Sequence, residues 1–563
     1  MDIAYFCPTC NVPIIGELCE RCGRPAGTPK IPLKISPVFK EELKMLNEVT
    51  GEPVDEFNSL ELWTSHRYYY YEGKKIFKVV GGNMVEEPKI EWLKDKKRVL
   101  SKLERNERID EKEYCHRIKE ANRFALGTLE EKSIRFIQKV VEEFRDEVVY
   151  EAISFSGGKD STVVSHLVRN ALGSNRILHI FADTTLENPD AMDFVERFAD
   201  EVFLLKAEPQ QDFFKLVEKA LFPSRIHRWC CTALKTAPIE KLLRQILEPG
   251  EKVLMFEGER REESQGRQKY EPLDFNFKIS SEIIARPILE WSTLEVWLYI
   301  LSRDLPINKS YKRGMRRVGC SLCPLAREYS EFLMEYWSNR DLSYHKIWNE
   351  MKGILIQDIV KRVDWNDLVE YLKRGKWKGR AGGSISNENY KLAEFSNLEE
   401  DYKYIRITLN KAIEMSTFGE YIKPLEKKYG LKSFESQIGM KTVIILSREQ
   451  EMICKIVLEG GSLCMWWFID ENKMYQQFLA DLKKQLVKYQ FCAYCGGCET
   501  KCVAFAITVD QESQRYIINS NRCIGCGECI NINERGCLLA DSARVKDYYK
   551  AKIGMTECIK NYH

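Results

Sequence analysis

Two apolar runs flank an amphipathic stretch near the middle of the chain. VVYEAISFS (148–156) and RILHIFAD (176–183) are nearly continuous apolar runs, as in parallel strands that are buried on both faces. The stretch between them, from Ser161 to about Leu172, has the period of an amphipathic helix. We therefore predict a strand–helix–strand unit of a parallel sheet, in which ligands bind at the carboxyl ends of the strands.

The flanking regions have different patterns. Residues 62–82, LWTSHRYYYYEGKKIFKVVGG, contain aromatic and β-branched runs broken by glycines, which indicates a hairpin. The tyrosines at 68–71 have basic neighbours and suit base stacking, although such a run is more often a strand packed on both faces. Residues 90–144 are charged and helical, whereas residues 402–412 and 441–469 alternate like the strands of a small α+β module.

Composition limits the functional classes. Apolar residues make up 44% and charged residues 30% of the chain, as in ordinary globular proteins, and the net charge of +2 gives no global field for binding nucleic acid. The chain has no apolar run as long as a membrane span, and its first residues lack the pattern of a secretory signal. We therefore expect a cytoplasmic protein whose 20 cysteines are metal ligands or reactive thiols rather than disulfides.

Most of the cysteines fall into four groups of four. The first group, C-x2-C-x8-C-x2-C, can close a tetrahedron of thiolates around zinc, or around iron as in a rubredoxin-like centre. Such a metal staples a segment that is too short to fold alone, and it also occurs in zinc ribbons that contact nucleic acid. The grouped cysteines are, in order, Cys7, Cys10, Cys19 and Cys22; Cys230, Cys231, Cys320 and Cys323; Cys492, Cys495, Cys498 and Cys502; and Cys523, Cys526, Cys529 and Cys537.

The turn between the first strand and the helix, SGGKDS, has the features of a phosphate cradle. Gly157 and Gly158 let backbone N–H groups approach an anion, the helix N-terminus adds its positive dipole, and Lys159 adds a full charge. The spacing differs from the Walker pattern G-x4-G-K-[ST].

Several separate stretches resemble one known family. SGGKDS is similar to the pyrophosphate loop of the N-type ATP pyrophosphatases, and residues 148–330 look like the phosphoadenylylsulfate (PAPS) reductase branch of that PP-loop superfamily. The stretches that carry this resemblance are SFSGGKDST, FADTTLENP, HRWCCTALKTAPI, GERREESQGR, RPILEWSTLEVWLYI and YKRGMRRVGCSLCP.

The resemblance implies an adenine nucleotide, ATP or an adenylylsulfate with Mg²⁺, along the strand ends. Its ribose or adenine would lie near Asp183, and Arg260, Arg261 and Arg267 would meet its anionic end, since arginine forks match phosphate and sulfate oxygens. The residues that would contact its phosphates are Ser156, Gly157, Gly158, Lys159, Asp160 and Ser161. Among all of these, Lys159, Asp160, Arg260 and Arg267 are the expected catalytic residues.

The second group of cysteines resembles the CC…CxxC set that binds a 4Fe–4S cluster in assimilatory adenylylsulfate reductases. Gly319–Pro324 also looks like a segment of the enzymes that put sulfur into DNA backbones. Four thiolates within a nucleotide-binding domain suit an iron–sulfur cluster. Its charge and hydrogen-bond partners would be Arg225, His227, Arg228 and Lys235.

Residues 490–540 resemble a bacterial two-cluster ferredoxin. In that family the fourth cysteine of each run serves the other cluster. One 4Fe–4S cluster would thus be held by Cys492, Cys495, Cys498 and Cys537, and the other by Cys523, Cys526, Cys529 and Cys502. The proline that follows the fourth cysteine in the family is replaced by Val503 and Leu538.

The predicted fold class is multidomain α/β, with a central adenine-nucleotide α-hydrolase-like (PP-loop) parallel sheet, an N-terminal zinc ribbon and a C-terminal ferredoxin-like domain with two 4Fe–4S clusters. The predicted segments are 1–30, the zinc ribbon; 31–90, a small β module; 91–147, a helical connector; 148–330, the nucleotide-binding domain; 331–400, a helical and basic extension with a linker; 401–488, the α+β module; 489–545, the ferredoxin domain; and 546–563, a tail.

Two enzymatic functions compete. In the first, ATP adenylylates a substrate, pyrophosphate leaves, and sulfur displaces AMP, with RNA or DNA as a candidate acceptor and an external low-potential donor supplying electrons. In the second, adenylylsulfate or phosphoadenylylsulfate is reduced to sulfite, which requires a nucleophilic cysteine such as Cys558 in TECIKNYH. The intact SGGKDS loop favours the first function. A non-catalytic electron-transfer or nucleic-acid-binding scaffold is the third alternative.

Overall fold

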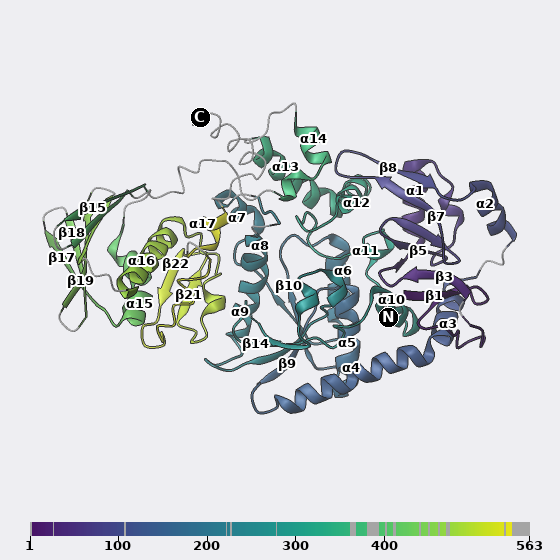
Figure 1. Cartoon of the computed structure of the whole chain (residues 1–563), viewed down its shortest axis with the longest axis horizontal. Helices are drawn as coiled ribbons and strands as arrows, with labels where there is room; N and C mark the ends of the chain where they lie inside the picture. Colours follow the sequence, from purple (N-terminus) through teal and green to yellow (C-terminus); the bar gives the residue numbers. More distant parts are fainter. Residues whose placement is uncertain are drawn as a thin grey trace.

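The computed structural model shows a mostly parallel sheet at the centre, two β modules on its N-terminal side and an antiparallel sheet on its C-terminal side (Figure 1). The residues that the structure describes are 3–25, 27–105, 109–220, 222–225, 228–276, 278–360, 367–379, 393–399, 402–408, 413–438, 441–448, 451–459, 462–468, 473–533 and 536–542. Among them, no helix combines the length and the apolar character needed to cross a bilayer.

The central sheet has six strands in the order β11-β10-β9-β12-β14-β13. Its strands are β9 (Tyr150–Ser154), β10 (Leu178–Ala182), β11 (Leu204–Ala207), β12 (Val253–Phe256), β13 (Leu273–Phe275) and β14 (Glu282–Ala285). All neighbours pair in parallel except β13, which runs antiparallel to β14 at the edge. The predicted strand–helix–strand unit is therefore confirmed, as is the predicted central parallel sheet.

Helices cover both faces of this sheet. One face packs under α5 (Lys159–Leu172), α6 (Pro189–Ala199) and α10 (Thr293–Ser302), and the other packs under α9 (Ala237–Leu243). Buried strands of a parallel sheet need cover on both sides, which explains the continuous apolar runs in the sequence. The shorter helices of this domain are α7 (Phe213–Lys219), α8 (Trp229–Cys231), the π-helix η2 (Thr232–Thr236), η3 (Arg261–Glu263), η4 (Arg267–Lys269) and α11 (Lys309–Lys312).

Two β modules form the N-terminal part. A three-stranded sheet, β2-β1-β3, precedes a five-stranded antiparallel sheet, β4-β5-β6-β7-β8. The elements are β1 (Ile3–Cys7), β2 (Val12–Ile14), β3 (Gly27–Pro32), β4 (Ser36–Pro37), α1 (Lys40–Thr50), η1 (Val54–Glu56), β5 (Leu62–Ser65), β6 (Tyr68–Tyr71), β7 (Lys74–Gly81) and β8 (Pro88–Trp92). Tyr69, Tyr70 and Tyr71 are buried, with 2%, 6% and 5% of their surface exposed, so the tyrosine run is a packed strand rather than a base-stacking platform.

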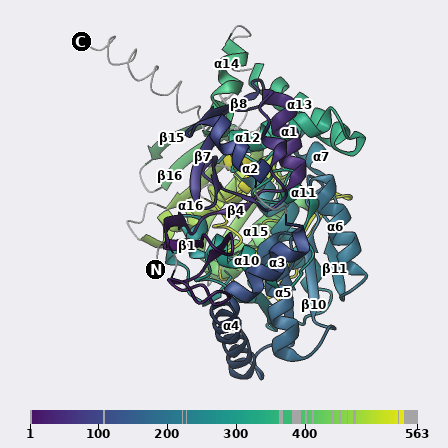
Figure 2. The ribbon, with the colours of Figure 1, turned by 90° about the vertical axis from the view of Figure 1, so that its right-hand side faces the viewer.

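The helical connector joins these modules to the central sheet. It consists of α2 (Lys96–Arg105), α3 (Glu111–Ala121) and α4 (Arg123–Glu143). Helix α4 packs on α5 and α10, and Figures 1 and 2 show it extended along the bottom of the molecule. After the central domain come α12 (Glu328–Ser338), α13 (Leu342–Val360), α14 (Leu368–Lys373) and η6 (Lys376–Gly379).

The C-terminal part begins with an antiparallel sheet in the order β15-β16-β20-β19-β18-β17. Its elements are β15 (Ala393–Glu399), β16 (Tyr402–Thr408), α15 (Met415–Tyr429), β17 (Lys432–Ile438), β18 (Lys441–Arg448), β19 (Glu451–Glu459), β20 (Ser462–Phe468) and α16 (Lys473–Phe491). Strand β15 pairs with β16 along its whole length, so the sheet starts before residue 401, where the alternating pattern had set its boundary.

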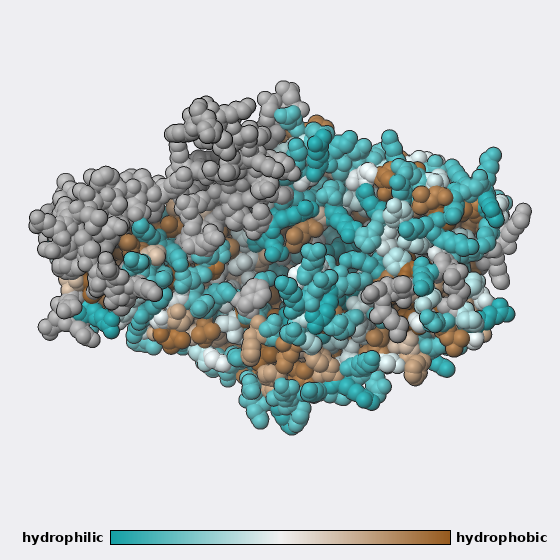
Figure 3. All heavy atoms as spheres, in the orientation of Figure 1, coloured by the Kyte–Doolittle hydropathy of each residue, from teal (hydrophilic) through white to brown (hydrophobic). Residues whose placement is uncertain are grey.

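The last described segment follows α16 directly and contains the two final cysteine groups. It consists of η7 (Glu499–Lys501), the hairpin β21 (Ile507–Asp510) and β22 (Arg515–Ile518), and α17 (Leu538–Ser542). Its apolar residues share one core with α15 and α16. The face seen in Figure 3 is mainly hydrophilic, with apolar atoms gathered over the lower end of the central sheet.

Candidate functional site

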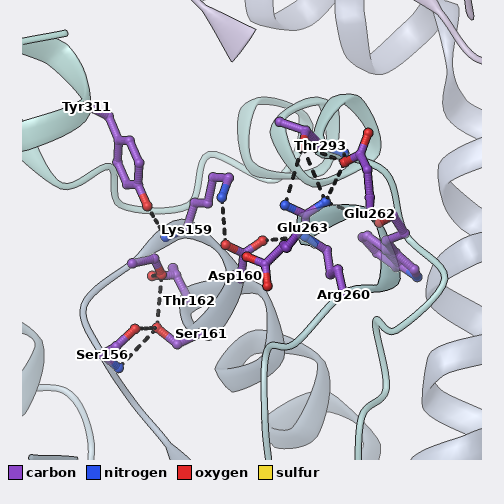
Figure 4. A network of polar contacts seen from close by, with 12 residues as sticks. Ser156, Lys159, Asp160, Ser161, Thr162, Arg260, Glu262, Glu263, Thr293 and Tyr311 are labelled. Carbon is purple, nitrogen blue, oxygen red and sulfur yellow. Dashed lines mark hydrogen bonds and ion pairs between the residues drawn. The ribbon is translucent and has the colours of Figure 1, made fainter. Parts of the chain in front are cut away.

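The SGGKDS loop lies at the carboxyl end of β9 and opens helix α5 (Figure 4). Gly157 has φ +67°, and a Cβ there would lie 2.9 Å from Val195 Cγ2, so both backbone geometry and space require glycine. The Ser156 N–H donates to Ser161 Oγ over 3.2 Å, and Ser161 Oγ donates to the Gly158 carbonyl over 2.9 Å. These bonds fix the loop in a tight turn at the helix N-terminus, where an anion is stabilised.

The loop sits where the strand order reverses. Strand β9 is followed along the chain by β10 on one side, while β12 lies on its other side. The loop after β12 approaches closely: a Cβ on Gly258 would be 2.9 Å from the Asp160 carbonyl carbon and 3.0 Å from the Ser161 nitrogen. A crevice at such a switch point is the usual ligand site of open parallel sheets. The sequence did not identify Gly258 as a close packing contact of the loop, because the residues around it do not indicate which backbone segment it contacts.

A buried charge network joins the two loops. Lys159 Nζ lies 2.6 Å from Asp160 Oδ2, and Arg260 Nε lies 2.8 Å from Asp160 Oδ1. Burial by itself would raise the pKa of Asp160, but the charges of Lys159 and Arg260 outweigh it and hold the pKa at about 2. Burial lowers the pKa of Lys159. Asp160 is therefore an anion that orients the lysine beside the loop.

The three arginines after β12 all lie in ion pairs. Arg260 is only 2% exposed and is enclosed by Asp160 and Glu262, whose carboxylate lies 2.9 Å from its Nη1. Arg261 pairs with Glu290 at 2.6 Å, and Arg267 pairs with Glu259 at 3.3 Å and with Glu263.

Thr293 donates to the same Glu262 carboxylate from its N–H and its hydroxyl. The structure thus gives Arg260 a positioning role toward Asp160, because its guanidinium is already bound by carboxylates, and it places all three expected arginines in ion pairs.

Two further residues hold the loop from α11. Tyr311 Oη accepts from the Lys159 N–H over 3.0 Å, and Asn308 Nδ2 donates to the Gly157 carbonyl over 2.9 Å. Both residues are buried. Tyr311 stands in one of the stretches that carry the family resemblance, but only the fold shows that it contacts the loop. Asp183 directly follows β10, one residue beyond the end of the strand, and its Oδ1 accepts from the Thr185 N–H over 2.8 Å.

The second cysteine group lies beside this loop. Cys230 and Cys231 end α8 and lead into the π-helix η2, a distortion that often marks functional sites. Cys320 forms a β-bridge with Glu187, just after β10, and its Sγ lies 3.5 Å from Thr184 Oγ1. The pKa of Cys231 is lowered to about 6, mainly by its hydrogen bond to the Cys230 thiol. The positive charges of Lys235, Arg228 and Lys278 also lower it.

The chain therefore brings the two halves of the CC…CxxC set to one place, and it supplies a thiolate there. Arg225 donates from Nε to the Pro324 carbonyl over 3.1 Å, which ties the two halves together. His227, which sequence reasoning placed nearby, lies outside the described residues.

The N-terminal cysteines form a compact quartet. In the described part of the chain, this is the one set of three or more potential ligands whose donor atoms all lie within 4.8 Å of one another. Cys7 and Cys22 Sγ are 3.7 Å apart, as are Cys10 and Cys19 Sγ. A tetrahedral zinc with Zn–S bonds of 2.3 Å implies about 3.8 Å between sulfurs. The residues present fit one tetrahedral ion.

The last two cysteine groups line two separate cavities. The first cavity is lined by Cys492, Cys495, Cys498 and Cys537, and the second by Cys502, Cys523, Cys526 and Cys529. Each set combines three cysteines of one run with the fourth of the other, which is the crossed pairing that the resemblance implies. The donor sets fit two iron–sulfur clusters. Cys558 lies outside the described residues.

The first of these cavities adjoins the second cysteine group. A Cβ on Gly496 would lie 3.1 Å from Ala237 Cβ, and one on Gly497 would lie 3.4 Å from Thr232 Cγ2, the residue after Cys231. Cys230, Cys495 and Cys537 also border the same apolar core. The second cysteine group and this first cavity therefore lie side by side in the molecule.

Comparison with known proteins agrees with this geometry. The model of the phosphoadenosine phosphosulfate reductase domain matches residues 151–326. The uncharacterized protein MJ0066 of Methanocaldococcus jannaschii is 32% identical over 263 residues, 46% of this chain and 51% of that protein, so the chain spans about half the length of this relative. The uncharacterized protein MJ0973 of the same organism is 30% identical over 327 residues, 58% of this chain and 73% of that protein.

Several relatives are named as reductases, and these match about a third of the chain. The adenosine 5′-phosphosulfate reductase of Bacillus mycoides is 29% identical over 189 residues, 32% of this chain and 75% of that protein. Among solved structures, the phosphoadenylyl-sulfate reductase of Candida auris covers 33% of this chain and 87% of its own, with 18% identity and a TM-score of 0.26.

Proposed function

Because this chain belongs to the same family as the uncharacterized M. jannaschii protein MJ0973 and contains a phosphoadenosine phosphosulfate reductase domain, we propose that it is an iron–sulfur enzyme acting on an adenine nucleotide. The nucleotide binds in the crevice between the loops after β9 and β12. The reaction that we favour is ATP-dependent sulfur transfer. The observation that carries this choice is the intact phosphate loop, with Lys159 and Asp160 held at a helix N-terminus.

The favoured reaction has two balanced steps. A substrate oxygen attacks the α-phosphorus of ATP, the α–β anhydride bond breaks, and pyrophosphate leaves into the loop. A sulfide sulfur then attacks the substrate carbon, the C–O bond breaks, and AMP leaves with the oxygen. Neither step changes the oxidation state of the sulfur when the donor is sulfide. When the donor is a persulfide, two electrons are required to reduce its outer sulfur to the sulfide level. Lys159 and the loop N–H groups stabilise the leaving pyrophosphate, because they bind charge that develops on it.

The cysteine groups have separate roles in this proposal. The N-terminal quartet holds a structural zinc. When bound, 4Fe–4S clusters at the other three groups supply one-electron transfer. The contacts of Gly496 and Gly497 with Ala237 and Thr232 support an order in which electrons from an external low-potential donor pass from the Cys523 group to the Cys492 group and then to Cys230 and its partners.

The acceptor class that we propose to test first is RNA or DNA. The support is the resemblance of Gly319–Pro324 to the enzymes that place sulfur in DNA backbones, together with the N-terminal cysteine quartet.

Reduction of adenylylsulfate is the second candidate. The observation in its favour is the similarity of about a third of the chain to adenosine 5′-phosphosulfate reductases of Bacillus mycoides and Geobacillus kaustophilus. In this reaction two electrons reduce the sulfur, the bond between sulfur and the bridging phosphate oxygen breaks, and AMP and sulfite leave. A substrate with only one phosphate would leave part of the SGGKDS loop without a ligand, which is why we place this reaction second.

Calorimetric titration of the anaerobic protein with ATP, adenylylsulfate and phosphoadenylylsulfate distinguishes the two candidates. We expect ATP to bind roughly ten- to hundredfold more tightly than adenylylsulfate or phosphoadenylylsulfate. This factor corresponds to the loss of one charge-assisted hydrogen bond to the pyrophosphate. Lys159→Ala should abolish this preference and leave the iron content unchanged. Tighter binding of adenylylsulfate, with release of sulfite from it under reduced viologen, would show that the second candidate is correct.

A further inference from the structure

We propose that Arg317 binds the α-phosphoryl oxyanion of the nucleotide, and thereby forms a subsite between the phosphate loop and the second cysteine group. This inference rests on the proposed function, because it assumes that a nucleotide binds at the SGGKDS loop. The resemblance to the reductase family implies no such role for Arg317. Three observations support it: the path of the chain, the pairing of its neighbours, and the charge at this point.

The chain around Arg317 runs directly from the loop to the cysteines. At one end, Tyr311 accepts from the Lys159 N–H over 3.0 Å. Val318 also lies close to the loop, because a Cβ on Gly158 would be 4.0 Å from Val318 Cβ. At the other end, Cys320 bridges to Glu187, and the Ser321 N–H donates to the Leu186 carbonyl over 2.7 Å. Arg317 therefore stands between the two centres.

The neighbouring arginines are already bound, whereas Arg317 is not. Arg313 is 7% exposed and pairs with Asp341 at 2.9 Å and with Asp190 at 3.5 Å. Arg316 pairs with the fully buried Glu42 of α1. Arg317 is exposed, and within the described part of the chain its guanidinium has no hydrogen bond or ion pair. Of these two adjacent residues, Arg316 is therefore structural and Arg317 is available to a ligand.

The charge of Arg317 reaches the phosphate loop. Burial is the main reason why the pKa of Lys159 is lowered, and Arg260 and Arg317 add to that effect. A cation with this reach also attracts an anionic group placed beside the loop.

The chemistry of the subsite follows from the guanidinium fork. Two parallel N–H groups match two oxygens of a tetrahedral oxyanion, which a lysine ammonium does less well. ATP and adenylylsulfate both have such an oxyanion at the α position, and the sulfonate of adenylylsulfate is a second possible source. Pyrophosphate held by the loop alone lies outside the subsite. Arg317 would thus bind the reacting phosphoryl group while Lys159 binds the leaving group.

Binding measurements on the full anaerobic chain test this division. The variants are Arg317→Ala and Arg317→Lys, with Arg197→Ala as a control, since Arg197 is exposed on α6 and pairs with Asp193 on the same helix. The probes are ATP, adenylylsulfate and inorganic pyrophosphate. We expect Arg317→Ala to weaken ATP binding about tenfold or more and to change pyrophosphate binding less than about twofold, while Arg317→Lys recovers part of the loss.

The remaining outcomes have fixed meanings. Equal losses for ATP and adenylylsulfate support the α-phosphoryl subsite, whereas a much larger loss for adenylylsulfate would assign Arg317 to its sulfonate and overturn the α-phosphoryl assignment. Equal weakening of ATP and pyrophosphate, or no change in either, overturns it. Lys159→Ala is measured alongside: if it leaves pyrophosphate binding unchanged, the proposed function fails independently of Arg317.

Discussion

At the scale of the residue, burial decides the charge of several carboxyl groups. Glu282, at the start of β14, is 3% exposed, and its carboxylate accepts from Asn276 Nδ2. Burial, together with the charge of Glu257, raises the pKa of Glu282 to about 8. Its side chain is therefore neutral in the folded protein at pH 7, whereas it ionises on unfolding.

Glu282→Gln should make the protein more stable at neutral pH. The folded pKa lies above the unfolded value, so unfolding releases a proton and stability falls as the pH rises from about 4.5 to about 8. Glutamine stays neutral at every pH and keeps an oxygen for Asn276. We expect the melting temperature of the variant to exceed that of the unchanged protein by a margin that grows over this range. Scanning calorimetry measures it, with Glu142→Gln as an exposed control; a margin independent of pH would contradict the explanation.

At the scale of the element, the four cysteine groups differ in how they are built. The N-terminal quartet is held by short strands and turns within residues 3–32, whereas the second group joins α8 to a loop 89 residues away. The last two groups exchange their fourth cysteines between two cavities. Loss of one cysteine should therefore affect its own site first.

Metal content tests these sites one by one. Anaerobically purified protein should contain about one zinc and about twelve irons, from three clusters of four irons each. Cys231→Ser should lower the iron to about eight and leave the zinc unchanged, and Cys10→Ser should remove the zinc and leave the iron. About eight irons in the fully loaded, unchanged protein would remove the cluster at Cys230 and its partners from the proposal.

At the scale of the whole molecule, one arginine joins the C-terminal segment to the central domain. Arg244, just after α9, donates to the Ile507 carbonyl over 2.8 Å, to the Cys502 carbonyl over 3.1 Å and to the Glu499 carbonyl. It also pairs with the fully buried Glu240 at 2.9 Å and lies over the ring of Phe505. A guanidinium can make these contacts together, because its five N–H groups point in fixed directions.

Arg244→Lys should loosen this attachment, because an ammonium cannot reach all three carbonyls. We expect faster hydrogen exchange in residues 499–510. Reduction of the nucleotide-bound protein by dithionite should be slower, whereas its affinity for ATP should change little. Hydrogen-exchange mass spectrometry measures the first effect, and Arg515→Lys on the exposed face of β22 serves as the control. Unchanged exchange in residues 499–510 would show that other contacts hold the segment.

The local pattern of the sequence was sufficient for the elements that depend on near neighbours. The continuous apolar runs gave β9 and β10, the amphipathic stretch gave α5, and the glycines of the loop gave its turn, because burial on both faces and positive φ leave direct marks on residue type. The C-x2-C spacings of the N-terminal group likewise indicated its quartet, because short spacings restrict how thiolates converge.

Only the tertiary structure decided which charged side chains are free to act. Arg260, Arg261, Arg267 and Arg317 are alike in the sequence, yet within the described part of the chain the first three are bound by carboxylates and the fourth is not. Arg260 and Arg261 meet Asp160 and Glu290 from distant stretches, whereas the partners of Arg267 lie in its own stretch. Likewise Gly258, Asn308 and Tyr311 hold the loop from stretches 97 to 152 residues away. Residue type fixes what a side chain can bind, but its partner depends on long-range packing, which no local pattern records.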